Sequence, residues 1–193
     1  PNDAYTYYNI GMTLKDQGKL DEAIEAYRET ISLKHDHAEA YDNMGMALKN
    51  QGKLDEAIEA HKKSILLKPF RAEAYNNIGN ALKEQGKFDK AIEAYNKALL
   101  IIPEYGEALY NMGSVLQQQG KFDDAIKAFK KAISIGLSMN HDLAMAKLSL
   151  AGILIQKRRK REATTLLNEA KKIDTQKMLS DQIKMMQQQM KRI

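Results

Sequence analysis

The ten residues QGKLDEAIEA occupy positions 17–26 and return unchanged at positions 51–60. Two edited copies follow, QGKFDKAIEA at 85–94 and QGKFDDAIKA at 119–128. The four copies therefore begin at one constant interval along the chain. A period of about 34 residues is typical of a solenoid built from stacked helix–turn–helix units.

Each repeat unit has the pattern of two helices joined by a turn. In residues 38–50, an apolar stripe with helical spacing runs through Tyr41, Met44 and Leu48. A glycine ends this first helix because it adopts the left-handed conformation without strain. An aspartate three residues later is expected to cap the second helix by accepting hydrogen bonds from its free amides. The glycines are Gly18, Gly52, Gly86 and Gly120, and the aspartates are Asp21, Asp55, Asp89 and Asp123.

A second set of glycines lies inside the first helices, where glycine costs about 1 kcal/mol relative to alanine. Each of them is followed by an alanine at the same position of the second helix, so we expect a contact between small residues that brings the paired helices close. An aromatic column follows four residues after the alanines, and His61 replaces the aromatic ring there; we expect a core histidine. The columns are Gly11, Gly45, Gly79 and Gly113; Ala23, Ala57, Ala91 and Ala125; and Tyr27, His61, Tyr95 and Phe129.

The pattern Y-x-x-M-G-x-x-L … A-x-x-x-H … S-x-x-x-x-P, from Tyr41 to Pro69, resembles a tetratricopeptide repeat. Four units match, and a degenerate fifth lies four residues out of frame, which predicts a longer turn near residues 136–140. Arg158 replaces the turn glycine of the fifth unit. The resemblance implies an all-α, right-handed superhelical solenoid of antiparallel helix pairs. The five units fill residues 1–177, at 4–37, 38–71, 72–105, 106–139 and 144–177.

The two ends of the chain differ from the repeats. Pro1 lies three repeat periods before Pro103, in the loop position of a preceding repeat, which favours a chain cut from a longer protein. A plain domain start with a chance proline is the alternative. Residues 178–193 carry one apolar helical face, from Leu179 through Ile183 and Met186. We expect a helix that caps the last repeat, with a coiled-coil or partner-binding helix as the alternative.

Composition and charge narrow the class of protein. The 193 residues are 44% hydrophobic and 28% charged, as in a soluble folded chain, and they contain no cysteine. No apolar run is long enough to span a membrane and no secretory signal opens the chain, so we expect a cytoplasmic protein. Residues 1–137 have a net charge of −2 and residues 138–193 a net charge of +7.

The candidate binding residues lie on the first helices, which line the concave side in the family that the chain resembles. Asparagine is a poor helix former, yet it recurs at one position of the first four units. We expect these amides to hold the backbone of an extended peptide, since each amide both donates and accepts hydrogen bonds. Resemblance to the superhelical arrays of protein glycosyltransferases implies the same role. Local bonding between repeats is the alternative. The column is Asn9, Asn43, Asn77 and Asn111.

Neighbouring positions on the same helices complete the predicted groove. Tyrosine and methionine there would provide apolar contact, and a lysine column would favour a polar or acidic segment, although such lysines can also be a solvated face. These residues are Tyr8, Met12, Asp42, Met46, Asn76, Asn80, Tyr110 and Ser114, together with Lys15, Lys49 and Lys83.

No sequence motif supports catalysis or a cofactor. The chain has no glycine-rich phosphate loop and no cysteine nucleophile. The HDH motif at 35–37 lies in a turn with no third metal ligand in view, so we expect no metal. The basic run Lys157–Arg161 also falls in a turn, where a solvated loop is favoured over nucleic acid or an acidic membrane.

We therefore predict a non-enzymatic scaffold that binds a protein or peptide partner in its concave groove. The alternative is the substrate-recruiting region of a larger transferase that transfers glycosyl or sulfuryl groups. Self-association is a further possibility, through apolar residues near the ends of the second helices. These are Leu66, Phe70, Leu100 and Ile102.

Overall fold

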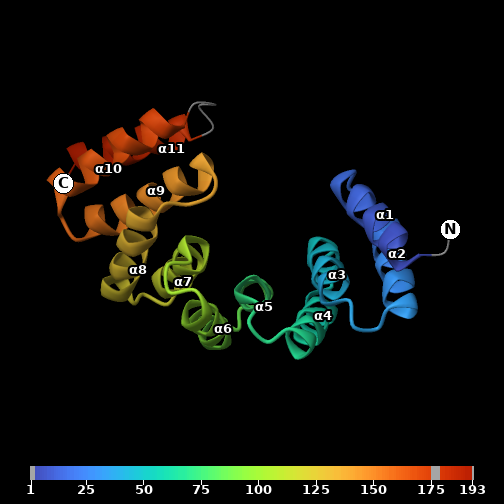
Figure 1. The fold of residues 1–193 in the computed structure, drawn as a ribbon. Helices are drawn as coiled ribbons and strands as arrows, with labels where there is room; N and C mark the ends of the chain where they lie inside the picture. Colours follow the sequence, from blue (N-terminus) through green and yellow to red (C-terminus); the bar gives the residue numbers. More distant parts are fainter. Residues whose placement is uncertain (1–2, 175–178, 193) are drawn as a thin grey trace. The chain divides into compact units, whose positions relative to one another are not determined.

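The computed structural model describes residues 3–174 and 179–192, and it is a succession of helices (Figure 1). The prediction about Pro1 therefore lies outside the described residues. The chain forms two compact units, which we call unit 1 (residues 1–103) and unit 2 (residues 104–193). Unit 1 contains α1 (Ala4–Asp16), α2 (Leu20–Leu33), α3 (Ala38–Asn50), α4 (Leu54–Leu67), α5 (Ala72–Glu84) and α6 (Phe88–Ile101). Unit 2 contains α7 (Gly106–Gln118), α8 (Phe122–Ile135), α9 (Asn140–Gln156), α10 (Lys160–Ile173) and α11 (Ser180–Lys191).

Helices pack in consecutive pairs, which confirms the predicted all-α solenoid of helix pairs. In unit 1, α1 packs on α2, α3 on α4 and α5 on α6, while α2 also packs on α3 and α4 on α5. Ile24 of α2 thus joins a buried cluster with Ala47 and Leu48 of α3. Ile58 of α4 makes the equivalent cluster with Ile78 and Ala81 of α5. Burial of these repeated apolar columns is what holds one repeat on the next.

The turn between paired helices has the predicted left-handed residue. Gly18, Gly52, Gly86 and Gly120 have φ angles between 72° and 76°. Arg158 occupies the same position in the fifth repeat with a φ of 57°, a conformation that is strained for a residue with a Cβ atom.

The predicted aspartate caps are wrong. The second helices begin one residue before the aspartate, and the capping residues, Lys19 among them, make no side-chain cap. Two of the aspartates in unit 1 reach to the next repeat instead. Asp21 Oδ1 accepts a hydrogen bond from Gln51 Nε2 at 2.9 Å, and Asp55 Oδ1 accepts one from Gln85 Nε2 at 2.8 Å. A short carboxylate in the first helical turn points outward, where it links repeats.

The glycines inside the first helices face aromatic rings, which corrects the predicted contact with alanine. A Cβ atom on Gly79 would lie 2.4 Å from Cε1 of Tyr95, and one on Gly11 would lie 2.6 Å from Cε1 of Tyr27. Gly45 faces the His61 ring and Gly113 faces the Phe129 ring in the same way. The glycine is required because a ring from the partner helix lies against the backbone at that point.

The four-residue insertion before the fifth repeat lengthens a helix, and the predicted longer turn is wrong. Residues 136–139 connect α8 to α9, and segments of the same length, 34–37 and 68–71, connect pairs in unit 1. Helix α9 has 17 residues whereas α7 has 13, so the insertion adds one turn at the start of α9. An added helical turn keeps its own backbone hydrogen-bonded, as a longer loop would not.

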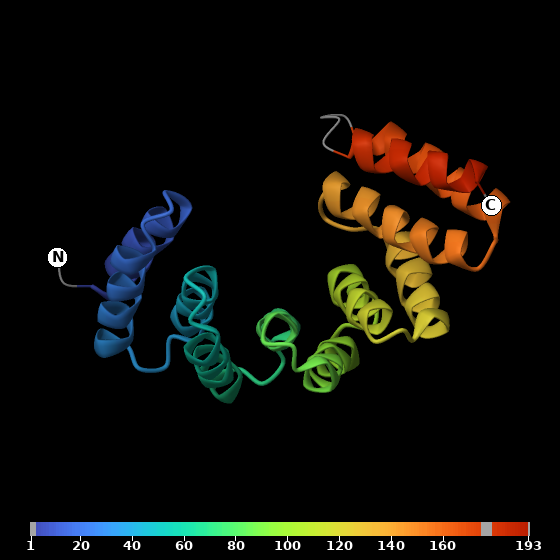
Figure 2. The same ribbon diagram turned by 180° about the vertical axis from the view of Figure 1, so that it is seen from behind.

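Helix α11 lies beside α10 and also contacts α9, as both ribbon views show (Figures 1 and 2). The apolar side chains of Leu179, Ile183 and Met190 are buried. The Thr164 hydroxyl of α10 donates a hydrogen bond to Met190 Sδ at 3.8 Å. The helix therefore covers apolar surface that α9 and α10 would otherwise expose. Ile193, the last residue of the predicted apolar face, lies outside the described residues.

Candidate functional site

The first helices of unit 1 lie next to one another, because α1 contacts α3 and α3 contacts α5. Residues at equivalent positions of α1, α3 and α5 therefore form columns that cross this face. In unit 2, α7 contacts α9 in the same way. Three columns contain most of the predicted site residues of unit 1, namely Asn9, Asn43 and Asn77; Met12, Met46 and Asn80; and Lys15, Lys49 and Lys83.

The asparagine column divides into two kinds of residue. Asn43 is bonded locally: its Nδ2 donates to the Tyr8 hydroxyl at 2.8 Å, and its Oδ1 accepts from Lys15 Nζ at 3.4 Å. Asn111 also has a partner. Neither the exposed Asn9 nor the half-buried Asn77 has a side-chain hydrogen bond within the described residues. The free amides thus alternate with a bonded one along unit 1.

The positions just before the asparagines take part in the packing of the repeats. Asp42 is 7% exposed and Asn76 is 6% exposed. The half-buried Tyr8 and Tyr110 pack against aromatic rings of α2 and α8, with centroids 6.1 Å from Tyr27 and 5.9 Å from Phe129. These four residues were predicted in the groove. Asp42 and Asn76 are buried, whereas the half-buried Tyr8 also contacts the next repeat, with its ring centroid 4.8 Å from that of His37.

Asp42 is the centre of a buried polar cluster in unit 1. Its Oδ1 lies 2.6 Å from His61 Nδ1, and its Oδ2 accepts from Arg71 Nη2 at 2.6 Å. Burial raises the pKa of Asp42, but the hydrogen bonds and charges of His61 and Arg71 outweigh burial and leave the pKa below its ordinary value. His61 is buried, as predicted for a core histidine. The Asp42–His61 pair thus replaces the tyrosine–aromatic pair of the first and fourth repeats.

The second column brings two methionines to the surface of this face. Met12 is 38% exposed and Met46 is half-buried, so both thioether side chains reach the surface. Asn80 Oδ1 accepts the Tyr95 hydroxyl at 2.9 Å, and Ser114 hydrogen-bonds Tyr110 in unit 2. The two methionines therefore offer adaptable apolar contact, since methionine has three rotatable bonds and a polarisable sulfur.

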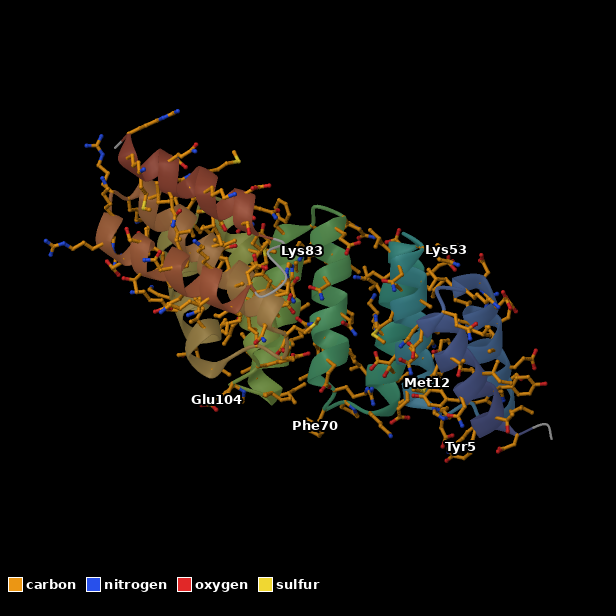
Figure 3. All side chains as sticks on the ribbon, turned by 90° about the horizontal axis from the view of Figure 1, so that it is seen from above. Tyr5, Met12, Lys53, Phe70, Lys83 and Glu104 are labelled. Atoms are coloured by element: carbon orange, nitrogen blue, oxygen red, sulfur yellow. The ribbon has the colours of Figure 1, made fainter. Side chains whose placement is uncertain are left out.

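Within the described residues, two of the three lysines in the lysine column have no ion pair, Lys15 and Lys83. Lys15 donates to Asn43, and Lys49 Nζ lies 3.4 Å from Glu84 Oε1. Lys83, near the end of α5 (Figure 3), has no ion pair among the described residues. Burial lowers the pKa of Lys83; the charge of Glu84 opposes this shift without restoring the ordinary pKa, and the charge of Lys49 adds to the lowering. A ligand carboxylate beside Lys83 would stabilise its charged form.

The remaining sequence predictions fall on turns and edges. His37, from the HDH motif, caps α3: its Nδ1 accepts a hydrogen bond from the Ala40 backbone amide at 3.3 Å. Within the basic run, Lys157 pairs with Asp123 and Arg159 pairs with Glu162. Phe70, which points outward from the chain in Figure 3, is 87% exposed.

Family models and the geometry agree on the class of protein. The model for the tetratricopeptide repeat matches residues 36–104, 70–137 and 104–176, and a second model, for the TPR repeat, matches residues 11–52. The chain belongs to the tetratricopeptide repeat family, as its repeat period predicted. Proteins of this fold serve as interaction scaffolds, which supports a protein-binding role. No curated protein matches the chain.

Solved structures share the fold. The chain is similar to MamA, with 28% identity, a TM-score of 0.74, and coverage of 87% of this chain and 96% of that one. PilF of Pseudomonas aeruginosa is 20% identical with a TM-score of 0.77, over 86% of this chain and 73% of that one. YrrB, described as a TPR protein with an unusual peptide-binding site, is 21% identical with a TM-score of 0.67, over 95% of this chain and 92% of that one. PilF and YrrB are alike in fold alone.

Sequence reasoning missed two features of unit 1. The Asp42–His61–Arg71 cluster was missed because its members lie on three different segments, and the sequence analysis assigned Asp42 to the groove, His61 to the aromatic column and Arg71 to neither. The signal was present, since both Asp42 and His61 depart from their columns in the same repeat. A groove between α4 and α6 in unit 1, lined by Tyr75 and Leu82 of α5, was also missed. Within residues 3–174 and 179–192, no helix is both long and apolar enough to cross a membrane.

Proposed function

We propose that the protein binds an extended, polar segment of a partner protein along α1, α3 and α5. The observation that carries the proposal is the side-chain amide of Asn77, which lies half-buried in the column beside Asn43 and has no hydrogen bond to the described residues. Asparagine weakens a helix relative to alanine. A ligand backbone that donates to and accepts from this amide would offset that cost.

The surroundings of Asn77 favour an acidic segment. Lys83 lies six residues later on α5 and carries an unpaired charge beside Lys49. Met12 and Met46 offer apolar contact on the neighbouring helices. An extended peptide with backbone amides for Asn9 and Asn77, and a carboxylate for Lys83, satisfies all of these groups. We propose that the protein binds its partner and catalyses no reaction.

A displayed library of random linear peptides provides the test. We expect selection on the wild-type protein to enrich acidic sequences, and the Asn77→Ala variant to bind them roughly 2- to 13-fold more weakly, because one hydrogen bond contributes about 0.5–1.5 kcal/mol. Asn43→Ala is the matched control, since Asn43 is already bonded to Tyr8 and Lys15. We expect this control to lower the melting temperature.

The two variants separate ligand binding from scaffold stability. Asn77→Ala should melt at or slightly above the parent temperature, because alanine is the better helix former. If Asn77→Ala binds the selected peptides as tightly as the parent does, the amide column does not hold ligand and the proposal is wrong.

A further inference from the structure

A groove lies on the opposite side of α5 from the asparagine column. Its volume is about 540 Å³, and its floor consists of Tyr75, Ile78 and Leu82 of α5. Ile58 of α4 and Ala94 of α6 contribute apolar walls. Tyr75 and Asn77 are two positions apart and so project about 200° from each other around the helix. A ligand in this groove would therefore not compete for the face that includes Asn77.

The chemistry of the groove favours a helix as its occupant. The floor runs from Tyr75 to Leu82, about 10 Å, which is two helical turns. Its backbone amides and carbonyls are used within α4, α5 and α6, so the floor offers side chains only. An extended peptide would leave its own backbone groups unpaired there, whereas a helix satisfies them internally. A helix with apolar residues at i, i+3, i+4 and i+7 matches a floor of this length.

The two lips of the groove differ in charge. On the α4 lip, Lys62 Nζ lies 2.7 Å from Glu59 Oε1, and Asp55 Oδ1 lies 3.9 Å from Lys87 Nζ. On the α6 lip, neither Lys90 nor Lys97 has an ion pair in the described part of the chain. Lys97 Nζ instead lies 5.9 Å from the centre of the Tyr75 ring. Glu93 also lines this lip, so its lysines outnumber its one carboxylate and the α6 lip is net cationic.

Exposed leucines extend the apolar surface past the charged lip. Leu100 follows Lys97 by three residues on α6 and is 83% exposed. Leu66, its equivalent on α4, is 75% exposed, whereas the first and fourth repeats have Ser32 and Ser134 at this position. The preceding groove, about 400 Å³ in volume and lined by Tyr41, Met44 and Leu48, belongs to the repeat that carries Leu66. The second and third repeats thus each expose a leucine near the end of the second helix, at a cost in solubility that ligand binding would explain.

We propose that the groove between α4 and α6 binds an amphipathic helix of a partner protein, with acidic residues along the flank that faces α6. The apolar side of this helix lies on Tyr75, Ile78 and Leu82 and extends to Leu100. The acidic flank pairs with Lys90 and Lys97. The protein would then bind two partner segments, or two parts of one partner, on opposite faces of α5.

A pair of synthetic helices tests the proposal. One amphipathic peptide of about five helical turns carries leucine at the i, i+3, i+4 and i+7 positions and glutamate on one flank; its match carries lysine on that flank. We expect the acidic peptide to bind about tenfold more tightly, because two attractive surface pairs replace two repulsive ones. Fluorescence anisotropy gives the affinities, and NMR shifts of the Ile58 and Ile78 methyl groups give the location.

Variants of the protein make the result specific. Leu100→Ser, which introduces the residue of the fourth repeat, should weaken the acidic peptide, and the Lys90→Glu/Lys97→Glu double variant should reverse the preference between the two peptides. Asn77→Ala should leave both affinities unchanged, which separates this groove from the proposed peptide face. Three results overturn the proposal. The first is equal affinity for the two peptides, or binding of neither, and the second is that NMR signals shift at Asn77 and not at Ile78. The third is a concentration-dependent dimer that Leu100→Ser abolishes, since a second copy of the chain would then occupy the groove.

Discussion

Replacing Gly79 by alanine tests the contact that sets the spacing within each helix pair. The new Cβ atom would lie 2.4 Å from Cε1, 2.7 Å from Cδ1 and 2.9 Å from Cζ of Tyr95. Real Cβ atoms do not approach other atoms so closely, and the ring has no room to move because Tyr95 is 0% exposed and its hydroxyl donates to Asn80. The pair α5–α6 must therefore open.

The magnitude follows from two opposing effects. Overpacking of a well-packed core costs about 1–3 kcal/mol, and the depth of this overlap favours the upper end. Alanine contributes about 1 kcal/mol of better helix propensity. We expect a net loss of about 2 kcal/mol in the free energy of unfolding, or a melting temperature about 4–8 °C lower for a chain of this length.

Gly152→Ala is the matched control for this prediction. Gly152 is also inside a helix, but the nearest atom to its added Cβ would be Met186 Cε at 3.4 Å, the end of a flexible side chain. We expect no loss and a gain of up to about 1 kcal/mol. Urea unfolding followed by circular dichroism measures both variants. If Gly79→Ala is as stable as Gly152→Ala, the ring contact does not explain why glycine recurs at this position of the first helices.

Three further predictions follow from the structure. Asp42→Asn should lower the free energy of unfolding by about 3 kcal/mol at pH 7, because it breaks a buried pair. Since His61 and Arg71 lower the folded pKa of Asp42, its contribution is present above the unfolded pKa of about 3.9 and is lost as pH falls through the folded pKa. The unfolding curves of variant and parent should therefore converge at strongly acidic pH, and a constant difference would contradict this reasoning. Arg158→Gly should raise stability by about 1 kcal/mol in thermal unfolding, because it relieves a φ of 57°; a lower melting temperature would refute the strain. Removing residues 179–193 should lower the melting temperature or cause aggregation, because each large apolar contact that α11 makes contributes about 1.5–3 kcal/mol, and an unchanged melting curve with a monomeric product would mean that α11 adds no stability.

The repeated turn and the apolar columns were predictable from the sequence because each follows from local rules. A glycine such as Gly52 at a helix end is selected by its own backbone conformation. The stripe through Tyr41, Met44 and Leu48 follows from helical periodicity alone. Four copies of one pattern make such rules reliable, since a chance match would not recur at a fixed interval.

The errors concern partners that only the folded chain brings together. Gly79 faces the Tyr95 ring and not Ala91, because helix crossing geometry decides which side chain lies over the glycine. Asp21 had the right residue type for a cap but bonds Gln51 of the next repeat. Asp42 had the right position for a groove but its partners His61 and Arg71 turn it inward. Spacing in the sequence predicts a face of a helix, and the neighbouring helix determines what that face contacts.

The central claim, that α1, α3 and α5 hold a peptide backbone, is tested most directly by NMR of the asparagine side chains. Peptide selected from the random library is titrated into protein labelled with ¹⁵N, and the side-chain amide signals of Asn9, Asn43 and Asn77 are followed. We predict that Asn77 and Asn9 shift to saturation while Asn43, already bonded to Tyr8, shifts least. Saturable peptide binding that leaves the Asn77 amide signal in place would contradict the claim.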